Sequence, residues 1–242
     1  MLEGTKVTKY FGGLPALKDV DFLVREKEIA GLIGPNGAGK TTLFNLVTGI
    51  YRPTSGAIKL DGRDVTRLKP HEICKLGIGR TFQIVIPFIE MTVLDNTMVG
   101  LLYGKGGRIG MREARSEALR YLDFVGLSEK KNVPAKSLTI ADRKMLEMAR
   151  ALSTNPRIIL LDEVVAGLNP TETLQAMNLV RRIRDELGIT VFWVEHVMKA
   201  VMGVAERVMV LHHGEKIAEG RPKEIAENRT VIDAYLGEKY IL

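Results

Sequence analysis

A glycine-rich loop between a short apolar run and a helix-forming segment constrains this chain more than any other feature. The loop is Gly34-Pro-Asn-Gly-Ala-Gly-Lys-Thr41, and it follows the apolar residues Ile29–Ile33. A strand, a glycine turn and a helix N-terminus together bind phosphate, because backbone N–H groups converge on anionic oxygens and the helix dipole adds favourable potential. We therefore predict a helix over residues 40–49 and a nucleoside triphosphate site at its N-terminus.

The residue types in the loop predict how the triphosphate is held. Lys40 supplies a point charge for the outer phosphates, and the Thr41 hydroxyl is placed to ligate Mg²⁺. An ordinary glycine-rich turn is the alternative, but every fixed position of the pattern is present in the required strand–helix context. The predicted phosphate-binding set is Gly34, Pro35, Asn36, Gly37, Ala38, Gly39, Lys40, Thr41 and Thr42.

A second segment, Arg157-Ile-Ile-Leu-Leu-Asp162-Glu163, ends in two acids. Its four apolar residues do not alternate with polar ones, which is typical of a parallel strand covered on both faces. Mg²⁺ at a phosphate loop needs a carboxylate at the end of such a strand, and adjacent strand residues point in opposite directions. We therefore predict that Asp162 holds the metal's water shell and that Glu163 polarises the attacking water; one of the two could instead be a solvated strand end.

Three further residues fall in order around this predicted site. Phe11 lies upstream of the loop, Gln83 ends the segment Arg80-Thr-Phe-Gln83, and His196 follows the apolar run 190–195. Each is weak evidence alone, since Phe11 could be a core residue, Gln83 a surface residue and His196 structural. Together with the acidic strand end, they make the chain resemble the ATP-binding cassette (ABC) ATPases over essentially all of its 242 residues.

The resemblance implies a role for each side chain. In the family, an aromatic ring at the position of Phe11 stacks on adenine, Gln83 is the Q-loop glutamine that links the metal site to a helical subdomain, and His196 is the switch histidine that contacts the γ-phosphate. The implied reaction is ATP hydrolysis by in-line attack of water in a closed dimer, with ATP and Mg²⁺ as the bound cofactors. The implied catalytic residues are Glu163, His196, Gln83 and Lys40, and the implied Mg²⁺ ligands are Thr41, Gln83 and Asp162.

The resemblance also implies the fold class, which is α/β. We expect a P-loop NTPase with a RecA-like core, an antiparallel β subdomain and an inserted α-helical subdomain. The expected single ABC ATPase domain spans 1–242, with a nucleotide-binding core at 1–83 and 155–242 and a helical signature subdomain at 84–154. Apolar spacing predicts a helix over 112–125 and a core-packed stripe at Leu174, Met177, Val180, Ile183 and Leu187, on a helix capped by Asn169. Strands are expected at 158–162, 190–195, 207–211 and near 216–219.

The signature segment departs from the family. The family's five residues are Leu-Ser-Gly-Gly-Gln, whereas this chain has Leu138-Thr-Ile-Ala-Asp142. In the family this loop closes on the nucleotide of the other subunit, so Thr139 and Ala141 are expected to contact the partner's ATP. Thr139 and Asp142 predict an N-cap and a first-turn acid. The methyl group of Ala141 and the charge of Asp142 predict weakened closure, and neutral variation is the alternative.

Within the family, the chain is most similar to the ATPase subunits of branched-chain amino acid importers. The segments that carry this similarity are Tyr10-Phe-Gly-Gly-Leu-Pro-Ala-Leu17, Glu90-Met-Thr-Val93, Ala166-Gly-Leu-Asn-Pro170 and, most discriminating, the tail Val231-Ile-Asp-Ala-Tyr-Leu-Gly237. The implied partners are two membrane-spanning permease subunits, a second ABC ATPase, identical or paralogous, and indirectly an extracytoplasmic solute-binding protein. The loop at 104–110 is shorter than expected for the larger of the two importer ATPase types.

Two other functions stay open. The ATPases of lipid or lipopolysaccharide exporters look similar in the core, and soluble cassette ATPases move no solute. The soluble type normally inserts a long coiled coil in the helical region, which this sequence lacks. Import and export are expected to differ at the docking groove that follows Gln83, where the run 84–89 is unusually apolar; burial in the core is the alternative for that run.

Composition agrees with one cytoplasmic cassette. No segment approaches the roughly 20 consecutive apolar residues of a membrane span, and the first residues show no signal-peptide pattern. The one cysteine, Cys74, fits a reducing compartment. The formal net charge of +6 is modest and favours a solvated surface, with phosphate ligands or an anionic inner leaflet as the alternatives. We expect no nucleic-acid partner. We expect a peripheral protein on the cytoplasmic face of the inner membrane.

Overall fold

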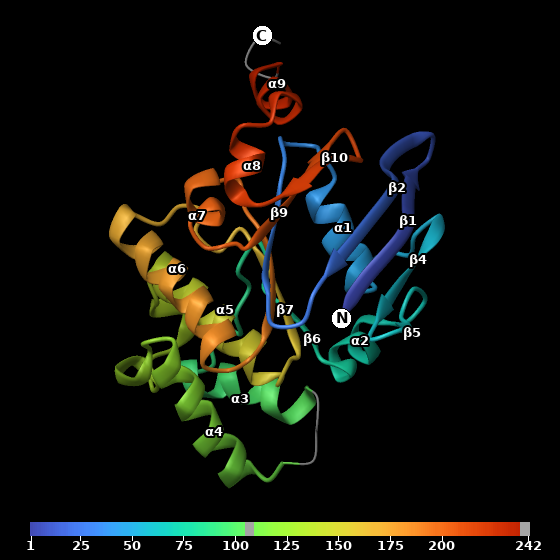
Figure 1. The fold of residues 1–242 in the computed structure, drawn as a ribbon. Helices are drawn as coiled ribbons and strands as arrows, with labels where there is room; N and C mark the ends of the chain where they lie inside the picture. Colours follow the sequence, from blue (N-terminus) through green and yellow to red (C-terminus); the bar gives the residue numbers. More distant parts are fainter. Residues whose placement is uncertain (105–108, 238–242) are drawn as a thin grey trace.

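A six-stranded sheet runs through the centre of the computed structural model, which describes residues 1–104 and 109–237 (Figure 1). Its strand order is β10-β9-β3-β8-β7-β6; only β10 is antiparallel to its neighbour. All residues of β3, β7 and β8 are buried because both faces of the sheet are covered. The strands are β3 (Ile29–Ile33), β6 (Ile78–Arg80), β7 (Ile158–Asp162), β8 (Thr190–Val194), β9 (Arg207–His212) and β10 (Glu215–Gly220).

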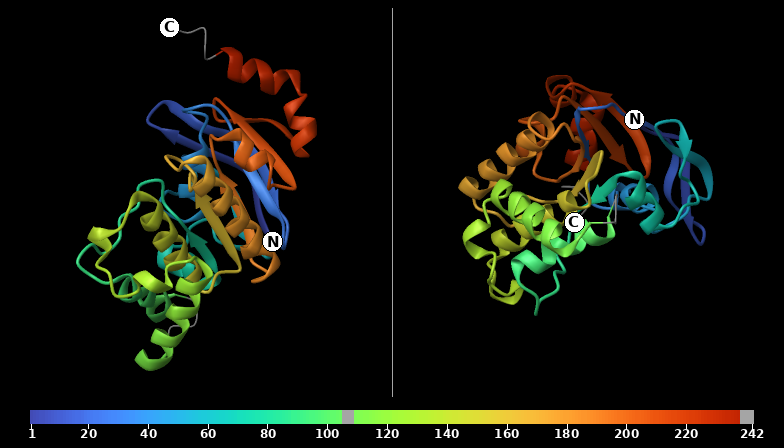
Figure 2. Two further views of the ribbon diagram at one scale, coloured as in Figure 1. Left: turned by 90° about the vertical axis from the view of Figure 1, so that its left-hand side faces the viewer. Right: turned by 90° about the horizontal axis from the view of Figure 1, so that it is seen from below.

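A second, antiparallel sheet has the order β2-β1-β4-β5 and lies on the opposite side of the molecule from α3, α4 and α5 (Figure 2). Its strands are β1 (Leu2–Phe11), β2 (Leu14–Val24), β4 (Ser55–Leu60) and β5 (Arg63–Asp64). Apolar residues of this sheet, of α1 (Lys40–Val47) and of the central sheet form one buried cluster. The first helix is therefore packed between the two sheets.

The remaining helices cover the central sheet and extend from it. The helices α3, α4 and α5 pack against one another, and their side chains join the second buried cluster with α6 and α7. The helices other than α1 are α2 (Pro70–Leu76), α3 (Val93–Tyr103), α4 (Met111–Phe124), α5 (Ile140–Ser153), α6 (Pro170–Asp185), α7 (Met198–Met202), α8 (Pro222–Ala226) and α9 (Arg229–Gly237). Two 3-10 turns lie at Ser128–Lys130 and Ala135–Ser137. Among the described residues, no helix has the length and apolarity needed to cross a membrane.

The predicted α/β core and antiparallel β sheet are confirmed, and the predicted strands lie within one residue of their observed bounds. The helix predicted over 40–49 ends at Val47, and the one predicted over 112–125 is Met111–Phe124. Asn169 caps α6 as predicted, because its Oδ1 accepts a hydrogen bond from the N–H of Glu172 at 2.9 Å. The loop at 104–110 lies partly outside the described residues.

The predicted core stripe of α6 is wrong at its two ends. Met177, Val180 and Ile183 are buried, whereas Leu174 is 60% exposed and Leu187 is 39% exposed. The helix has 16 residues and its neighbouring strand β8 has 5. The first buried residue of the helix is Ala176, and Leu187 lies beyond the last helical residue, Asp185.

Candidate active site

The glycine loop connects the carboxyl end of β3 to α1, and two of its glycines leave no room for a side chain. A Cβ on Gly34 would lie 2.1 Å from the carbonyl oxygen of Leu211. Gly39, the N-cap of α1, has φ 102°, and a Cβ there would lie 2.6 Å from the carbonyl oxygen of Ala16. Glycine is needed at both positions because of these close approaches. The first N–H groups of α1 have no intrahelical partner, which is what the anion-binding end predicted from the sequence requires.

The side chain of Lys40 folds back over this loop. Its ammonium group donates to the carbonyl oxygens of Gly34 at 2.6 Å and of Pro35 at 2.8 Å, and the residue is buried. Asn36, Gly37 and Thr41 are exposed, Ala38 is buried and Thr42 is half-buried. The lysine charge is thereby held inside the loop, where the phosphates of a bound nucleotide would lie.

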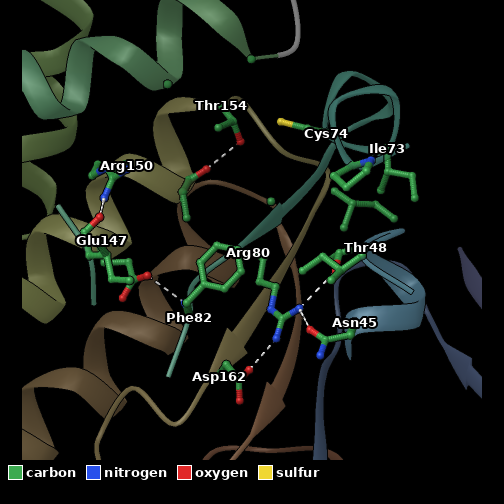
Figure 3. A pocket seen from close by; sticks show the side chains of 18 of the residues that line it. Asn45, Thr48, Ile73, Cys74, Arg80, Phe82, Glu147, Arg150, Thr154 and Asp162 are labelled. Atoms are coloured by element: carbon green, nitrogen blue, oxygen red, sulfur yellow. Dashed lines mark hydrogen bonds and ion pairs between the residues drawn. The ribbon is translucent and has the colours of Figure 1, made fainter. Parts of the chain in front are cut away.

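Asp162, the last residue of β7, is held by an arginine from the neighbouring strand. Its Oδ2 accepts a hydrogen bond from Arg80 Nη2 at 2.8 Å, and both side chains are buried. Arg80 also donates to Asn45 Oδ1 at 2.7 Å and to Thr48 Oγ1 at 3.1 Å (Figure 3). Burial raises the pKa of Asp162 above its ordinary value, and the hydrogen bond and charge of Arg80 oppose that rise. Sequence reasoning missed Arg80, although it precedes the glutamine by three positions.

The predicted Mg²⁺ ligands fit a hard cation. Thr41, Gln83 and Asp162 line one cavity of about 800 Å³. Asp162 Oδ1 is buried and has no hydrogen-bond partner within the described part of the chain. A carboxylate, a hydroxyl and an amide carbonyl are oxygen donors of the kind that Mg²⁺ prefers. The free carboxylate oxygen is therefore available to a metal or to its water shell.

Glu163 lies against two of the other three predicted catalytic side chains, Gln83 and His196. Its Oε2 accepts a hydrogen bond from Gln83 Nε2 at 2.8 Å and lies 3.6 Å from His196 Nδ1. The sequence argument separated Glu163 from Asp162 by strand alternation, and that reason is wrong. The strand β7 ends at Asp162, and Glu163 has a left-handed backbone with φ 51°. A turn therefore directs the two carboxylates to different places.

Phe11 lies at the end of β1 with 44% of its surface exposed, so the alternative that it is a core residue is wrong. The ring of Tyr51 packs edge-on against it, with centroids 5.2 Å apart and planes at 78°. The ammonium of Lys9 lies 5.1 Å from the centroid of the Phe11 ring. An exposed aromatic ring at this strand end is available for stacking on a base.

Thr139 and Asp142 form the predicted cap of α5. Thr139 Oγ1 accepts from the N–H of Asp142 at 3.1 Å and donates to its Oδ2 at 2.8 Å. The ammonium of Lys130 lies 2.5 Å from the same oxygen. Burial disfavours ionisation of Asp142, but the hydrogen bonds from Lys130 and Thr139 lower its pKa below the ordinary value. The charge expected to repel a nucleotide is thus compensated within the chain. Ala141 lies in the first turn of α5.

The apolar run after Gln83 is on the surface. Ile84 is 74% exposed and Ile86 is 75% exposed, and Phe88 and Ile89 are also exposed, so the core alternative is wrong for these four residues. Ile84 and Ile86 line the same cavity as the predicted Mg²⁺ ligands. Exposed apolar side chains therefore border the cavity that the predicted Mg²⁺ ligands line.

Comparisons with known proteins agree with this geometry. The family described as "ABC transporter" matches residues 17–166, and the family described as "Branched-chain amino acid ATP-binding cassette transporter" matches residues 215–241. The high-affinity branched-chain amino acid transport ATP-binding protein LivG of Salmonella typhimurium is 45% identical, with 94% of each chain covered. The protein of the same description from Pseudomonas aeruginosa, BraF, is 42% identical with 98% of each chain covered. The lipopolysaccharide export system ATP-binding protein LptB of Acidithiobacillus ferridurans is 35% identical over 99% of this chain and 98% of its own.

Solved structures extend the comparison. The ADP conformation of MJ1267, an ATP-binding cassette of an ABC transporter, has a TM-score of 0.88 and 33% identity, with 98% of each chain covered. The cassette MJ0796, bound to ADP and Pi in a dimeric post-hydrolysis state, has a TM-score of 0.84 and 30% identity over 92% of this chain and 99% of its own. The same fold therefore holds nucleotide in both of these proteins.

Proposed function

The chain belongs to the ABC transporter ATPases, and from that premise we propose that it is the ATP-hydrolysing subunit of a membrane importer for branched-chain amino acids or related amino acids and amides. The observation that carries the hydrolytic part is the meeting of Glu163 with Gln83 and His196 beside Asp162. All four residues follow or end parallel strands of one sheet, at the edge where such sheets bind ligands. Import is supported by the match of the tail and by relatives of 42% and 45% identity, against 35% for the lipopolysaccharide export protein.

Each part of the site has a proposed task in hydrolysis. The loop amides and Lys40 neutralise the phosphates of ATP, and Phe11 stacks on its adenine. Thr41, Gln83 and Asp162 would hold Mg²⁺, which would supply positive charge to the phosphate oxygens. Glu163 orients and deprotonates the attacking water. Positioning and electrostatics provide most of the acceleration in such phosphoryl transfer.

The site has to rearrange before hydrolysis. Gln83 donates to the carboxylate of Glu163 at 2.8 Å, so that carboxylate oxygen is occupied. A base must lie within hydrogen-bond reach of the water whose proton it takes. We propose that Gln83 leaves Glu163 as ATP binds and that His196, which is half exposed, then turns to the γ-phosphate.

We also propose the assembly. The cassette divides into a nucleotide-binding core (1–83 and 155–242) and a helical signature subdomain (84–154). It pairs with a second ABC ATPase whose signature loop closes on its nucleotide, and Thr139 and Ala141 contact the partner's ATP in turn. Two permease subunits dock against the exposed Ile84 and Ile86, on the cytoplasmic face of the inner membrane. An extracytoplasmic solute-binding protein delivers the solute.

The test of the hydrolytic role is Glu163→Gln, which keeps the size of the side chain and removes the base. Turnover should fall by about 10²-fold or more while ATP still binds, and an ATP-bound dimer should accumulate. The matched control is Glu129→Gln, at an exposed glutamate outside the site. Undiminished ATPase activity of the purified Glu163→Gln protein would refute the assignment of the base. ATP-driven uptake of labelled leucine into vesicles that hold the assembled transporter tests the solute class.

A further inference from the structure

The helix α5 carries three charged residues at intervals of three: Lys144, Glu147 and Arg150. Lys144 is 9% exposed and Glu147 is 6% exposed, although both carry ionisable groups. Buried charges are costly unless they are paired and hydrogen-bonded. A helix that served only to pack would place apolar residues at these positions, so the contacts of the three side chains need an explanation.

Each of the three side chains binds the main chain of a loop at the active site. Lys144 Nζ donates to the carbonyl oxygen of Glu163 at 2.8 Å. Glu147 Oε1 accepts from the N–H of Phe82 at 2.8 Å (Figure 3). Arg150 Nη1 donates to the carbonyl oxygen of Ile86 at 3.1 Å. The helix therefore holds the backbone of the proposed base and the backbone on both sides of Gln83.

These contacts hold both partners of the hydrogen bond between Gln83 and Glu163. Glu163 has the left-handed φ of 51°, which L side chains rarely adopt, and its carbonyl oxygen accepts from Lys144 and from the N–H of Ala166. Phe82, whose N–H binds Glu147, immediately precedes Gln83. The main chain that carries each of the two catalytic side chains is thus anchored to one helix, while the side chains themselves can still move.

Three acids lie close enough to Lys144 to act on its charge. Burial lowers the pKa of Lys144 below its ordinary value, and the carboxylates of Glu195, Glu147 and Glu163 oppose that fall. Glu195 is fully buried, and its Oε1 accepts from the N–H of Val165, two residues after Glu163. The ammonium group is therefore surrounded by the acids and the backbone of the loop that carries the base.

We propose that Lys144 and Glu147 are positioning residues for ATP hydrolysis: Lys144 fixes the main chain of Glu163, and Glu147 fixes the main chain beside Gln83. The inference rests on the proposed hydrolytic role of Glu163. The helix that carries both residues begins at the signature cap Thr139. If the N-terminal end of α5 moves when the signature segment binds a nucleotide, the main chain of Glu163 and the main chain beside Gln83 should therefore move with it.

The test of Lys144 uses Lys144→Met, which keeps the chain length and removes the donor. We expect kcat of the assembled transporter to fall by about 10-fold or more while KM for ATP changes by less than about 3-fold, because positioning of the base affects the chemical step and not binding. Lys144→Arg keeps a cationic donor and should recover most of kcat. The matched control is Lys136→Met, at an exposed lysine whose side chain pairs with Glu90 and makes none of these contacts.

A double-mutant cycle separates positioning from general damage. In the Glu163→Gln background, Lys144→Met should cause little further loss, since both changes act through the same carboxylate. The proposal would be overturned if Lys144→Met lowered kcat by the same factor in the Glu163→Gln background as in the wild type. A kcat for Lys144→Met within about 2-fold of wild type would also overturn it. If Lys144→Met fails to fold, Lys144→Gln takes its place with the same expectations.

Hydrogen exchange gives a readout that needs no hydrolysis. In the purified nucleotide-free chain, Lys144→Met should speed amide exchange several-fold in the segment 163–168 and leave the control variant at the wild-type rate. Glu147→Leu should speed exchange at 82–86, and Glu147→Gln, which keeps the acceptor, should not. Unchanged exchange in both segments would overturn the proposal. A wild-type transporter without ATPase activity would instead contradict the proposed function and leave these exchange results to decide the inference.

Discussion

Replacing Arg80 with methionine should destabilise the nucleotide-free protein more than any other single change at the site. The pair formed by Arg80 and Asp162 has an N–O distance of 2.8 Å, and their side chains are 6% and 1% exposed. Removing one partner of such a buried pair costs about 3–5 kcal/mol, because the remaining charge is left buried without compensation. The unfolding equilibrium constant should therefore rise by roughly 10²- to 10⁴-fold.

The loss of stability caused by Arg80→Met should increase as pH rises. Arg80 lowers the pKa of Asp162 against the larger effect of burial, so its removal raises the pKa of that carboxyl further. A carboxyl group with a raised folded-state pKa contributes stability that is lost as pH rises through that pKa. The difference between Arg80→Met and wild type should be small at acid pH, where Asp162 is protonated in both proteins, and should grow as pH rises between the two folded-state pKa values.

The assay is urea unfolding of the purified chain with chelator, at several pH values. Asp162→Asn and the double variant Arg80→Met/Asp162→Asn complete a cycle, and the double variant should be more stable than the sum of the two single losses predicts because it leaves neither charge alone. A loss below about 1 kcal/mol for Arg80→Met, or strict additivity in the cycle, would show that the pair is not the buried unit described here.

Two further predictions concern α5. Restoring the family residues with Ala141→Gly and Asp142→Gln should tighten ATP-dependent dimerisation and raise ATPase activity several-fold, and Ala141→Gly should account for most of the gain because Lys130 already compensates Asp142. Gel filtration and hydrolysis measured for each single change check this, and no gain from Ala141→Gly would show that the methyl group is harmless. Burial raises the pKa of Glu147 from 4.5 to about 7, so its contribution to stability is full below pH 4.5 and is lost, by about 3 kcal/mol, as pH rises to about 7. Glu147→Gln should remove that part of the pH dependence in urea unfolding between pH 5 and 8; a difference between the two proteins that stays constant with pH would contradict it.

Part of the site could be read from short stretches of sequence. The glycine loop needs residues without a Cβ where the backbone approaches closely, as at Gly39, and glycine in the sequence reports that need directly. The unbroken apolar run of β7 and the cap residues Asn169 and Thr139 are similarly local signals. The predictions that went wrong concerned extent and exposure: Leu174 and Leu187 fit a helical period, but Leu174 is exposed and Leu187 follows the end of the helix at Asp185.

The sequence by itself determined the loop, the acidic strand end and the order of elements, because these depend on backbone geometry and periodicity over a few residues. It indicated the family through the resemblance of its motifs to those of known ATPases. Only the tertiary structure decided which charges meet. Arg80 and Asp162 are 82 positions apart, Gln83 and Glu163 are 80 apart, and Lys130 reaches Asp142 across 12. Those pairings depend on which strands become neighbours and on where a helix lies over them. Local sequence patterns do not encode the order of the strands or the position of the helix, because both depend on how the whole chain buries its apolar surface.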